Sequence, residues 1–365
     1  MNAGAALQRR RGLLASADPP IRLMIVDDSA VARAVLSRIV GADSDFELIA
    51  EASNAREAIE ALAVAEVDIV LLDVEMPGAS GLEALPEILR TGRGARVLIV
   101  SSMAEDGAEV TVRALAGGAA DTLPRPGAGD LGGRFSDMLG DRLRRIGRAA
   151  RDRTPLAAHD ANADSFLLRP MPDAPLNCLA LGASTGGLPA LIDFLGALPT
   201  RIGAPILITQ HLPDVFMSHF ARQLENACGR TAVVAAEGDP VRREIIHVAP
   251  GDAHLCVLRH GAEVRIGLDR RRAPSGCRPS VDPMLASVAV AYRETGLGVV
   301  LSGMGRDGLI GGRKLVEAGG ALLAQNRATC SIWGMPRAVA EAGLAAAILP
   351  PADLARRVAT RIGAA

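Results

Sequence analysis

Residues 176–187 read LNCLALGASTGG, an apolar run followed at once by a glycine-rich turn. The run has the length and composition of a buried strand, and a helical pattern follows over residues 188–195. Ser184 lies inside the turn. A Gly-x-Ser-x-Gly turn can expose a nucleophilic hydroxyl above a sheet edge, and a glycine-rich turn can also let a dinucleotide phosphate approach a helix N-terminus. A plain strand-to-helix turn is the third interpretation, so this stretch predicts an α/β domain and leaves its function open.

Apolar runs and helical patterns continue to alternate through the second half of the chain, which predicts a sheet that is mostly parallel. We expect an antiparallel excursion around residues 232–266. The further strands are predicted at residues 205–209, 232–235, 245–248, 255–258, 298–301 and 321–324, and the further helices at 216–227, 281–292, 308–318, 336–342 and 352–362.

A serine nucleophile needs a base, and His211 is the best placed of the six histidines. His211 directly follows a buried strand, which puts it at the same sheet edge as Ser184. A structural role is the alternative, because most single histidines have one. The other histidines are expected in a linker, a helix, two strands and a hairpin turn: His159, His219, His247, His254 and His260.

The acid that orients such a base is predicted at Asp307, in the second glycine-rich turn, LSGMGRDG (301–308). Capping of the helix that follows is the alternative role for this aspartate, and one carboxylate can serve both purposes. The glycines of the turn would free backbone N–H groups for an oxyanion. The chain order Ser184, His211, Asp307 differs from the serine–acid–histidine order of α/β-hydrolases, so that fold is not inferred.

The first half also alternates strands and helices, and acidic residues follow its strands. Strands are predicted at residues 23–26, 46–50, 69–72, 97–100 and 121–123, and helices at 30–40 and 55–65. Asp27, Asp28 and Asp73 follow strands whose carboxyl ends meet in one crevice, where three carboxylates favour Mg²⁺. Ser101 and Arg125 come to the same edge. This set can accept a phosphoryl group on a carboxylate, although aspartates also prefer turns for purely structural reasons.

The motifs MIVDDS (24–29), LDVEMPG (72–78) and VSS (100–102) resemble a response-regulator receiver domain. The resemblance implies that Asp73 accepts the phosphoryl group from a sensor histidine kinase. It also implies that Asp27, Asp28, Asp73 and the Glu75 backbone carbonyl bind Mg²⁺, and that Ser101 is the switching hydroxyl. The family's lysine after the fifth strand is here Arg125, which keeps the charge and changes the reach of the side chain.

In the second half, the two glycine-rich turns together with QHLP (210–213), RPSVD (278–282) and WGMPR (333–337) resemble the chemotaxis protein-glutamate methylesterase family. The resemblance implies hydrolysis of glutamyl methyl esters on methyl-accepting chemoreceptors and deamidation of certain receptor glutamines, without a cofactor. Ser184, His211 and Asp307 fall on the family's triad. The Met304 backbone falls on its oxyanion donor, and Thr185 is our second candidate donor. Cys277 stands where members often have histidine, and residues 325–327 lack the acidic residues frequent there.

Composition limits the remaining functions. The 365 residues carry a formal net charge of −1 and 2% aromatic residues, which argues against nucleic-acid binding. Five cysteines, none with metal-ligand spacing to another, argue against a disulfide framework or a zinc site and fit a reducing cytoplasm. No apolar run is long enough to span a membrane. We expect a cytoplasmic monomer.

Two α/β domains with parallel sheets are therefore predicted, a flavodoxin-like receiver and a doubly wound methylesterase domain. A receiver fused to a non-catalytic binding module and a nucleotide-binding oxidoreductase are the competing interpretations. The oxidoreductase is disfavoured because no acidic residue stands about 20 residues beyond the Ser184 turn. The predicted segments are a disordered lead-in (1–20), the receiver (21–138), a linker (139–175) and the catalytic domain (176–365). A basic helix is predicted near residues 135–151, across the boundary between the receiver and the linker.

Overall fold

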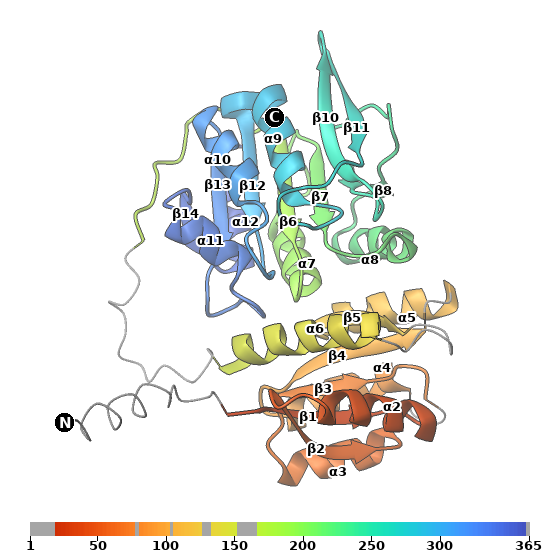
Figure 1. Cartoon of the computed structure of the whole chain (residues 1–365). Coiled ribbons are helices and arrows are strands. Elements are labelled where there is room, and N and C mark those ends of the chain that lie inside the picture. The colour runs from red at the N-terminus through yellow and green to blue at the C-terminus, as the bar shows by residue number, and fades with distance from the viewer. Residues whose placement is uncertain (1–18, 77–79, 103–104, 126–132, 152–165, 363–365) are drawn as a thin grey trace, which may run out of the picture.

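The computed structural model describes residues 19–76, 80–102, 105–125, 133–151 and 166–362, which form two α/β domains, one above the other in Figure 1. Both domains are built on parallel sheets, as predicted. The predicted lead-in lies outside the described residues except for Pro19 and Pro20, and so does His159. None of the described helices is long and apolar enough to cross a membrane.

The first domain is a five-stranded parallel sheet in the order β2-β1-β3-β4-β5. One face packs against α2 and α6, and the other against α3, α4 and α5, so both faces are buried. The strands are β1 (Ile21–Val26), β2 (Phe46–Ala52), β3 (Ile69–Leu72), β4 (Arg96–Ser102) and β5 (Asp121–Arg125). The helices are α2 (Ala30–Gly41), α3 (Ala55–Val64), α4 (Gly81–Thr91), α5 (Glu105–Ala116) and α6 (Gly133–Arg151).

Helix α6 differs from the sequence-based boundary, which ends the receiver at residue 138 and starts a linker at 139. Leu139, Leu143 and Ile146 are fully buried in the same apolar cluster as Leu23 and Leu71 of the receiver sheet. Their spacing puts all three on one face of the helix. Residues 139–151 are therefore a helix packed on the receiver and not a tether.

The second domain contains a seven-stranded sheet in the order β14-β13-β12-β6-β7-β9-β8, in which every neighbouring pair is parallel. The antiparallel excursion predicted over residues 232–266 is wrong for β8 and β9, because residues 235–245 return the chain to the same end of the sheet. Strands β10 and β11 pair antiparallel as a separate hairpin, and Pro240 forms an antiparallel bridge with Arg265 of β11. The sheet strands are β6 (Cys178–Ala183), β7 (Ile206–Gln210), β8 (Ala232–Val234), β9 (Ile246–Val248), β12 (Gly296–Val300), β13 (Ala321–Gln325) and β14 (Ala347–Leu349), and the hairpin strands are β10 (His254–His260) and β11 (Glu263–Asp269).

Helices cover both faces of this second sheet. One face packs against α7 (Gly187–Ala197), α8 (Met217–Cys228) and α12 (Pro351–Ala359). The opposite face packs against α9, α10 and α11. Their bounds are Val281–Tyr292, Leu309–Glu317 and Met335–Glu341. Short 3₁₀ helices cover Asp214–Phe216 and Arg293–Thr295.

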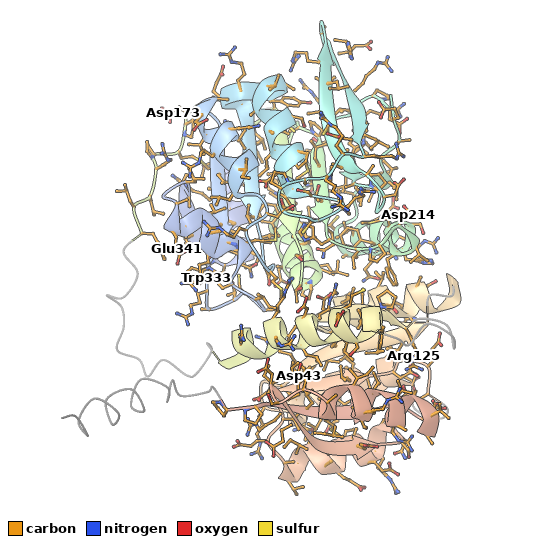
Figure 2. The ribbon with its side chains drawn as sticks, in the orientation of Figure 1. Asp43, Arg125, Asp173, Asp214, Trp333 and Glu341 are labelled. Atoms are coloured by element: carbon orange, nitrogen blue, oxygen red, sulfur yellow. The ribbon has the colours of Figure 1, made fainter. Side chains whose placement is uncertain are left out.

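The two domains contact each other through apolar and polar groups. One apolar cluster continues from the α3–α5 face of the receiver into the α7–α8 face of the second domain. Ile332 and Met304 of the second domain pack against the cluster that contains α6. Figure 2 shows Trp333 and Asp214 at the end of the second domain that faces the receiver. At this contact the Gly186 amide donates to the Ala120 carbonyl (2.7 Å), just before β5.

Candidate active site

Ser184 lies directly after β6, where the turn before α7 holds its side chain at the sheet edge. Its amide donates to the Ser302 carbonyl (3.0 Å), and its carbonyl accepts from Gln210 Nε2 (2.9 Å). Gly186 has a φ of +68°, and a Cβ there would lie 2.1 Å from the Ser331 Cβ. Only glycine satisfies both constraints, which explains the local sequence around the serine.

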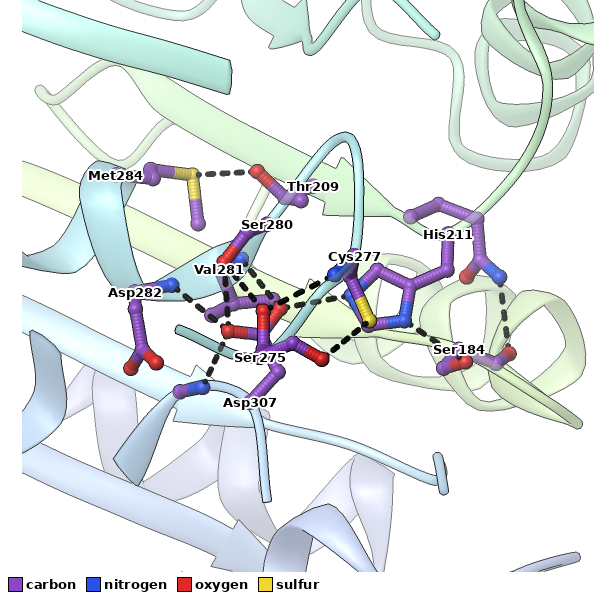
Figure 3. Close-up of polar contacts among 12 residues, drawn as sticks. Ser184, Thr209, His211, Ser275, Cys277, Ser280, Val281, Asp282, Met284 and Asp307 are labelled. Atoms are coloured by element: carbon purple, nitrogen blue, oxygen red, sulfur yellow. Dashed lines mark hydrogen bonds and ion pairs between the residues drawn. The ribbon is translucent and has the colours of Figure 1, made fainter. Parts of the chain in front are cut away.

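His211 follows β7 and lies beside Ser184. Its Nδ1 is 3.1 Å from the Ser184 Oγ, and its Nε2 is 2.8 Å from the Asp307 Oδ2 (Figure 3). The three residues predicted from the ends of separate strands are thus connected by two successive hydrogen bonds. When the ring is neutral and its Nε2 proton is donated to Asp307, the Nδ1 lone pair faces the serine hydroxyl, which is the tautomer a general base requires.

The Asp307 carboxylate is almost fully buried and is held by several donors besides His211. Oδ1 accepts from the Ser280 hydroxyl (2.7 Å) and the Asp282 amide (3.2 Å), and Oδ2 accepts from the Val281 amide (2.7 Å). Asp307 therefore caps the N-terminus of α9 rather than acting only on α10, the helix that follows it. Its carboxylate is fixed from one side and presented to His211 on the other.

The hydrogen bond between His211 and Asp307 shifts the pKa of both groups. Burial favours the neutral form of each group, but the mutual hydrogen bond and charge attraction outweigh it. The pKa of Asp307 falls to about 2, with the Val281 amide and the Ser280 hydroxyl also contributing. The pKa of His211 rises to about 9, and a hydrogen bond with Cys277 contributes to that rise.

Thr185 and Met304, the candidate oxyanion donors, both lie next to Ser184. A Cβ on Gly303, the neighbour of Met304, would come 2.8 Å from the Ser184 Cβ, so the two turns approach each other closely. Across the part of the chain that the structure describes, neither the Thr185 amide nor the Met304 amide has a hydrogen-bond partner. Within the described residues, neither amide is therefore committed to another group.

The receiver packs against this site and covers part of it. The Thr185 hydroxyl donates to Asp121 Oδ2 (2.7 Å) in a buried contact, and Asp121 Oδ1 pairs with Arg142 of α6 (2.8 Å). Arg145 of α6 reaches the Met304 sulfur (3.6 Å). A cavity of about 580 Å³ remains between the domains, lined by residues of both, including Ser184, His211, Cys277, Met138 and Arg142.

The predicted acidic crevice is at the carboxyl ends of the receiver strands, away from the end that contacts the esterase domain. Carboxylate oxygens of Asp27, Asp28 and Asp73 come within 4.8 Å of one another, a suitable donor set for a hard divalent cation. Arg125 forms ion pairs with Asp27 and with Asp73, the latter at 3.4 Å. Burial raises the pKa of Asp27 in spite of the nearby Arg125. The Glu75 amide donates to Asp73 (3.1 Å), and Ser101 lies in β4 with its side chain outside the described set.

Sequence reasoning gave no role to several residues that hold the site together. Gln210 binds the Ser184 carbonyl, and Ser280 contacts Asp307. His254, fully buried, accepts from the Ser280 amide (2.9 Å) and bonds the Arg271 carbonyl (2.8 Å), which fixes the loop before α9. A serine just before a helix is a usable signal for Ser280, whereas the parts played by Gln210, His254 and Asp121 depend on tertiary contacts.

Comparison with known proteins agrees with this division of the chain. The CheB methylesterase family model matches residues 179–358, and the response regulator receiver domain model matches residues 23–131. The crystal structure of the Thermotoga maritima CheB methylesterase catalytic domain is 33% identical, with 50% of this chain and 97% of that chain covered and a TM-score of 0.49.

Two full-length relatives carry the name protein-glutamate methylesterase/protein-glutamine glutaminase. The protein from Caulobacter vibrioides is 42% identical over 347 residues, which cover 93% of this chain and 99% of the relative. The protein from Paramagnetospirillum magneticum is 36% identical over 361 residues, covering 92% and 94%. The chain therefore belongs to the CheB family of protein-glutamate methylesterases/protein-glutamine glutaminases, in which a response regulator receiver domain precedes a methylesterase domain.

Proposed function

We propose that this chain is a phosphorylation-activated serine hydrolase that removes methyl esters from glutamate residues of methyl-accepting chemoreceptors and deamidates specific receptor glutamines. The observation that carries the proposal is the pair of hydrogen bonds from Ser184 Oγ through His211 to Asp307, at 3.1 and 2.8 Å. Family membership supplies the substrate class. The partners are a chemoreceptor as substrate and a sensor histidine kinase as phosphodonor.

The esterase reaction follows from the positions of the three side chains. His211 Nδ1 takes the proton of Ser184 as its oxygen attacks the ester carbonyl, while Asp307 stabilises the imidazolium. The amides of Thr185 and Met304 donate to the oxyanion. The imidazolium proton leaves with methanol, or with ammonia from a glutamine. Water, deprotonated by His211, then releases the glutamate and restores the serine.

In the receiver, Asp73 accepts the phosphoryl group on a carboxylate oxygen. Asp27, Asp28, Asp73 and the Glu75 carbonyl would hold Mg²⁺, which neutralises charge on the transferred group. Arg125 supplies a second positive charge, because it already pairs with Asp27 and Asp73. We assign the switch to Ser101 and Arg125.

Control is assigned to the contact between the domains. The Thr185 hydroxyl and the Gly186 amide, both beside Ser184, are engaged by Asp121 and the Ala120 carbonyl of the receiver. A receptor segment that needs these groups therefore competes with the receiver for them. Phosphorylation of Asp73 increases activity by weakening this contact.

A serine-directed phosphonate probe tests the catalytic assignment. We expect Ser184→Ala to lose labelling and to lose methanol release from methylated receptor by about 10³-fold or more, because no other group supplies the nucleophile. Ser37→Ala, which removes a receiver hydroxyl bonded to Glu51, should label normally. Near-normal methanol release by Ser184→Ala would refute the mechanism. A native chain that neither labels nor releases methanol would favour a non-catalytic binding module.

A further inference from the structure

Cys277 lies beside the triad and has no part in the proposed reaction. It stands on the loop before α9 and is partly exposed, and it lines the cavity between the domains. Its Sγ, a ring nitrogen of His211 and a carboxylate oxygen of Asp307 all lie within 4.8 Å of one another. Figure 3 shows the Cys277 sulfur next to the His211 ring.

We propose that Cys277, His211 and Asp307 bind one soft divalent cation of the Zn²⁺ class, and that this cation reversibly inhibits the hydrolase. The inhibition part rests on the proposed function, whereas the binding part stands on the three side chains alone. Thiolate, imidazole and carboxylate are the three side-chain ligands that zinc takes in proteins.

The distances fit a metal after a small adjustment. Zinc binds nitrogen and oxygen at about 2.1 Å, so two such ligands of a tetrahedral ion lie roughly 3.4 Å apart. The His211 Nε2 and Asp307 Oδ2 are now 2.8 Å apart with a proton between them. A shift of roughly half an ångström would open this pair enough for a metal to replace the proton.

The surroundings of the three ligands favour this exchange. Asp307 is anchored by Ser280 and Val281, so its carboxylate is oriented by outer contacts as metal-binding carboxylates are. The movement is therefore left to the imidazole and the thiol, on the side that faces the cavity. The cavity also leaves room for water as a fourth ligand, the arrangement of an open three-ligand site.

Metal binding removes the base from the reaction. When His211 Nε2 binds the ion, the remaining ring proton of the neutral imidazole is on Nδ1, the atom that faces Ser184. Nδ1 then donates to the serine oxygen and has no lone pair to accept its proton. The thiol loses its proton to solvent when the ion binds, and so does an imidazolium.

The sequence could not reveal this site by spacing. Metal motifs are recognised when ligands are a few residues apart in the chain, and here the ligands come from three separate loops. The site also differs in kind from the receiver crevice, since a thiolate and an imidazole prefer soft ions whereas the Asp27, Asp28 and Asp73 oxygens prefer hard ones.

Cobalt absorption tests the binding directly. The full chain is titrated with Co²⁺ in excess Mg²⁺, which occupies the receiver carboxylates, and in a non-thiol reductant. We expect a thiolate-to-cobalt charge-transfer band in the near ultraviolet that Zn²⁺ displaces. Cys277→Ser should abolish the band and weaken Zn²⁺ binding roughly 10- to 100-fold or more. Cys256→Ser, which alters another partly buried thiol, should keep it.

Phosphonate labelling tests the inhibition. Zn²⁺ should protect Ser184 in the native chain and in Cys256→Ser, and protection should be lost in Cys277→Ser and Cys277→Ala. A cobalt band or zinc protection that persists without Cys277 would overturn the proposal. Labelling that zinc leaves unchanged in the native chain would overturn the inhibition and leave the hydrolase assignment standing. A chain that never labels would count against the hydrolase assignment, while the cobalt band still decides the metal site.

Discussion

The proton on His211 favours stability and opposes catalysis, because it strengthens the bond to Asp307 and prevents the ring from acting as a base. Burial would lower the pKa of His211, but the hydrogen bond to Asp307 and the one with Cys277 raise it to about 9. At neutral pH the imidazole of the receiver-covered form is therefore mostly charged. Activity requires that proton to leave.

We expect kcat/KM for methyl ester hydrolysis to rise with pH up to about 9, the pKa of His211, since only the neutral ring accepts the Ser184 proton. Stability should move in the opposite direction. The pKa of His211 in the folded protein is above its ordinary value of 6.5, so the protonated ring stabilises the fold by on the order of 1–3 kcal/mol. This stabilisation is complete below pH 6.5 and is lost as pH rises through about 9.

Urea unfolding of native protein and His211→Gln across pH 6 to 10 measures the stability effect. The difference between the two free energies of unfolding should shrink with rising pH. A difference that stays constant, or a pH–rate profile that falls above pH 7, would contradict the assignment of the proton to His211.

The triad positions were accessible from sequence for a simple physical reason. Parallel strands end at one edge of a sheet. Ser184 and His211 directly follow strands and Asp307 lies in the turn after β12, so all three were expected near one another. Their outer partners were not accessible, because they depend on how helices and domains pack. Asp121 reads as the first residue of a strand and gives no sign that it meets Thr185.

Helices α9 and α10 support the site by capping each other. Asp307, which precedes α10, accepts amides at the start of α9, and Asp282 in the first turn of α9 accepts the Gly311 amide of α10 (2.7 Å). Burial, with the nearby negative charge of Asp307 as a further cause, raises the pKa of Asp282 to about 6, although the hydrogen bond from the Gly311 amide acts in the other direction. The position of Asp307, the proposed catalytic acid, thus depends on a contact between two helix N-termini.

We expect Asp282→Asn to stabilise the protein above pH 6 by on the order of 1 kcal/mol. The folded pKa of Asp282 is above its ordinary 3.8, so its favourable contribution is complete below that value and lost as pH rises through about 6. Asparagine keeps an oxygen for Gly311 without the charge. Asp282→Ala leaves that amide unpaired and should destabilise by about 1–2 kcal/mol.

Thermal unfolding of the two variants at pH 5 and pH 8 separates charge from hydrogen bonding. Asp282→Asn should have a higher unfolding temperature than the native chain only at pH 8. Equal destabilisation by asparagine and alanine would mean that the negative charge itself is required by the two helix N-termini.

Helices and strands were predicted well where the apolar residues repeat regularly. Strand direction and the packing of helices were predicted poorly where they depend on tertiary contacts. Strand β3 and helix α9 have the predicted bounds because their patterns are continuous. Strands β8 and β9 are three residues each, too short to indicate a parallel arrangement. Helix α6 follows a glycine-rich stretch, and its role as a cover of the receiver sheet depends on tertiary burial.

The acidic crevice of the receiver and the receiver's contact with the esterase domain lie at opposite ends of the receiver strands. Asp73 is beyond the carboxyl end of β3, whereas Asp121 and Ala120, which contact the esterase turn, are at the start of β5. Arg96, the first residue of β4, also contacts the Ser331 carbonyl (3.2 Å). A change at Asp73, the proposed phosphorylation site, therefore has to act through the receiver to release the contact at the other end of the strands.

We expect Asp121→Ala to raise basal esterase activity about 5- to 30-fold without a phosphodonor, because it removes a buried hydrogen bond worth roughly 1–2 kcal/mol from the covered state. A phosphodonor should then add less than it does for the native chain. Glu87→Ala, which removes an exposed carboxylate paired with Arg90 on the same helix, is the control. Unchanged basal methanol release in Asp121→Ala would argue that this contact does not restrain the enzyme.

The hydrogen bond from the Gly186 amide to the Ala120 carbonyl has a thermodynamic consequence for signalling. If a receptor segment and the receiver compete for the same turn, receptor binding and receiver phosphorylation must favour each other by the same factor, since linkage between two equilibria is reciprocal. A high local concentration of receptor would then draw the enzyme into its open form by mass action alone. The local abundance of methylated receptor would set how much phosphate is needed, and the enzyme would respond to its substrate as well as to its kinase.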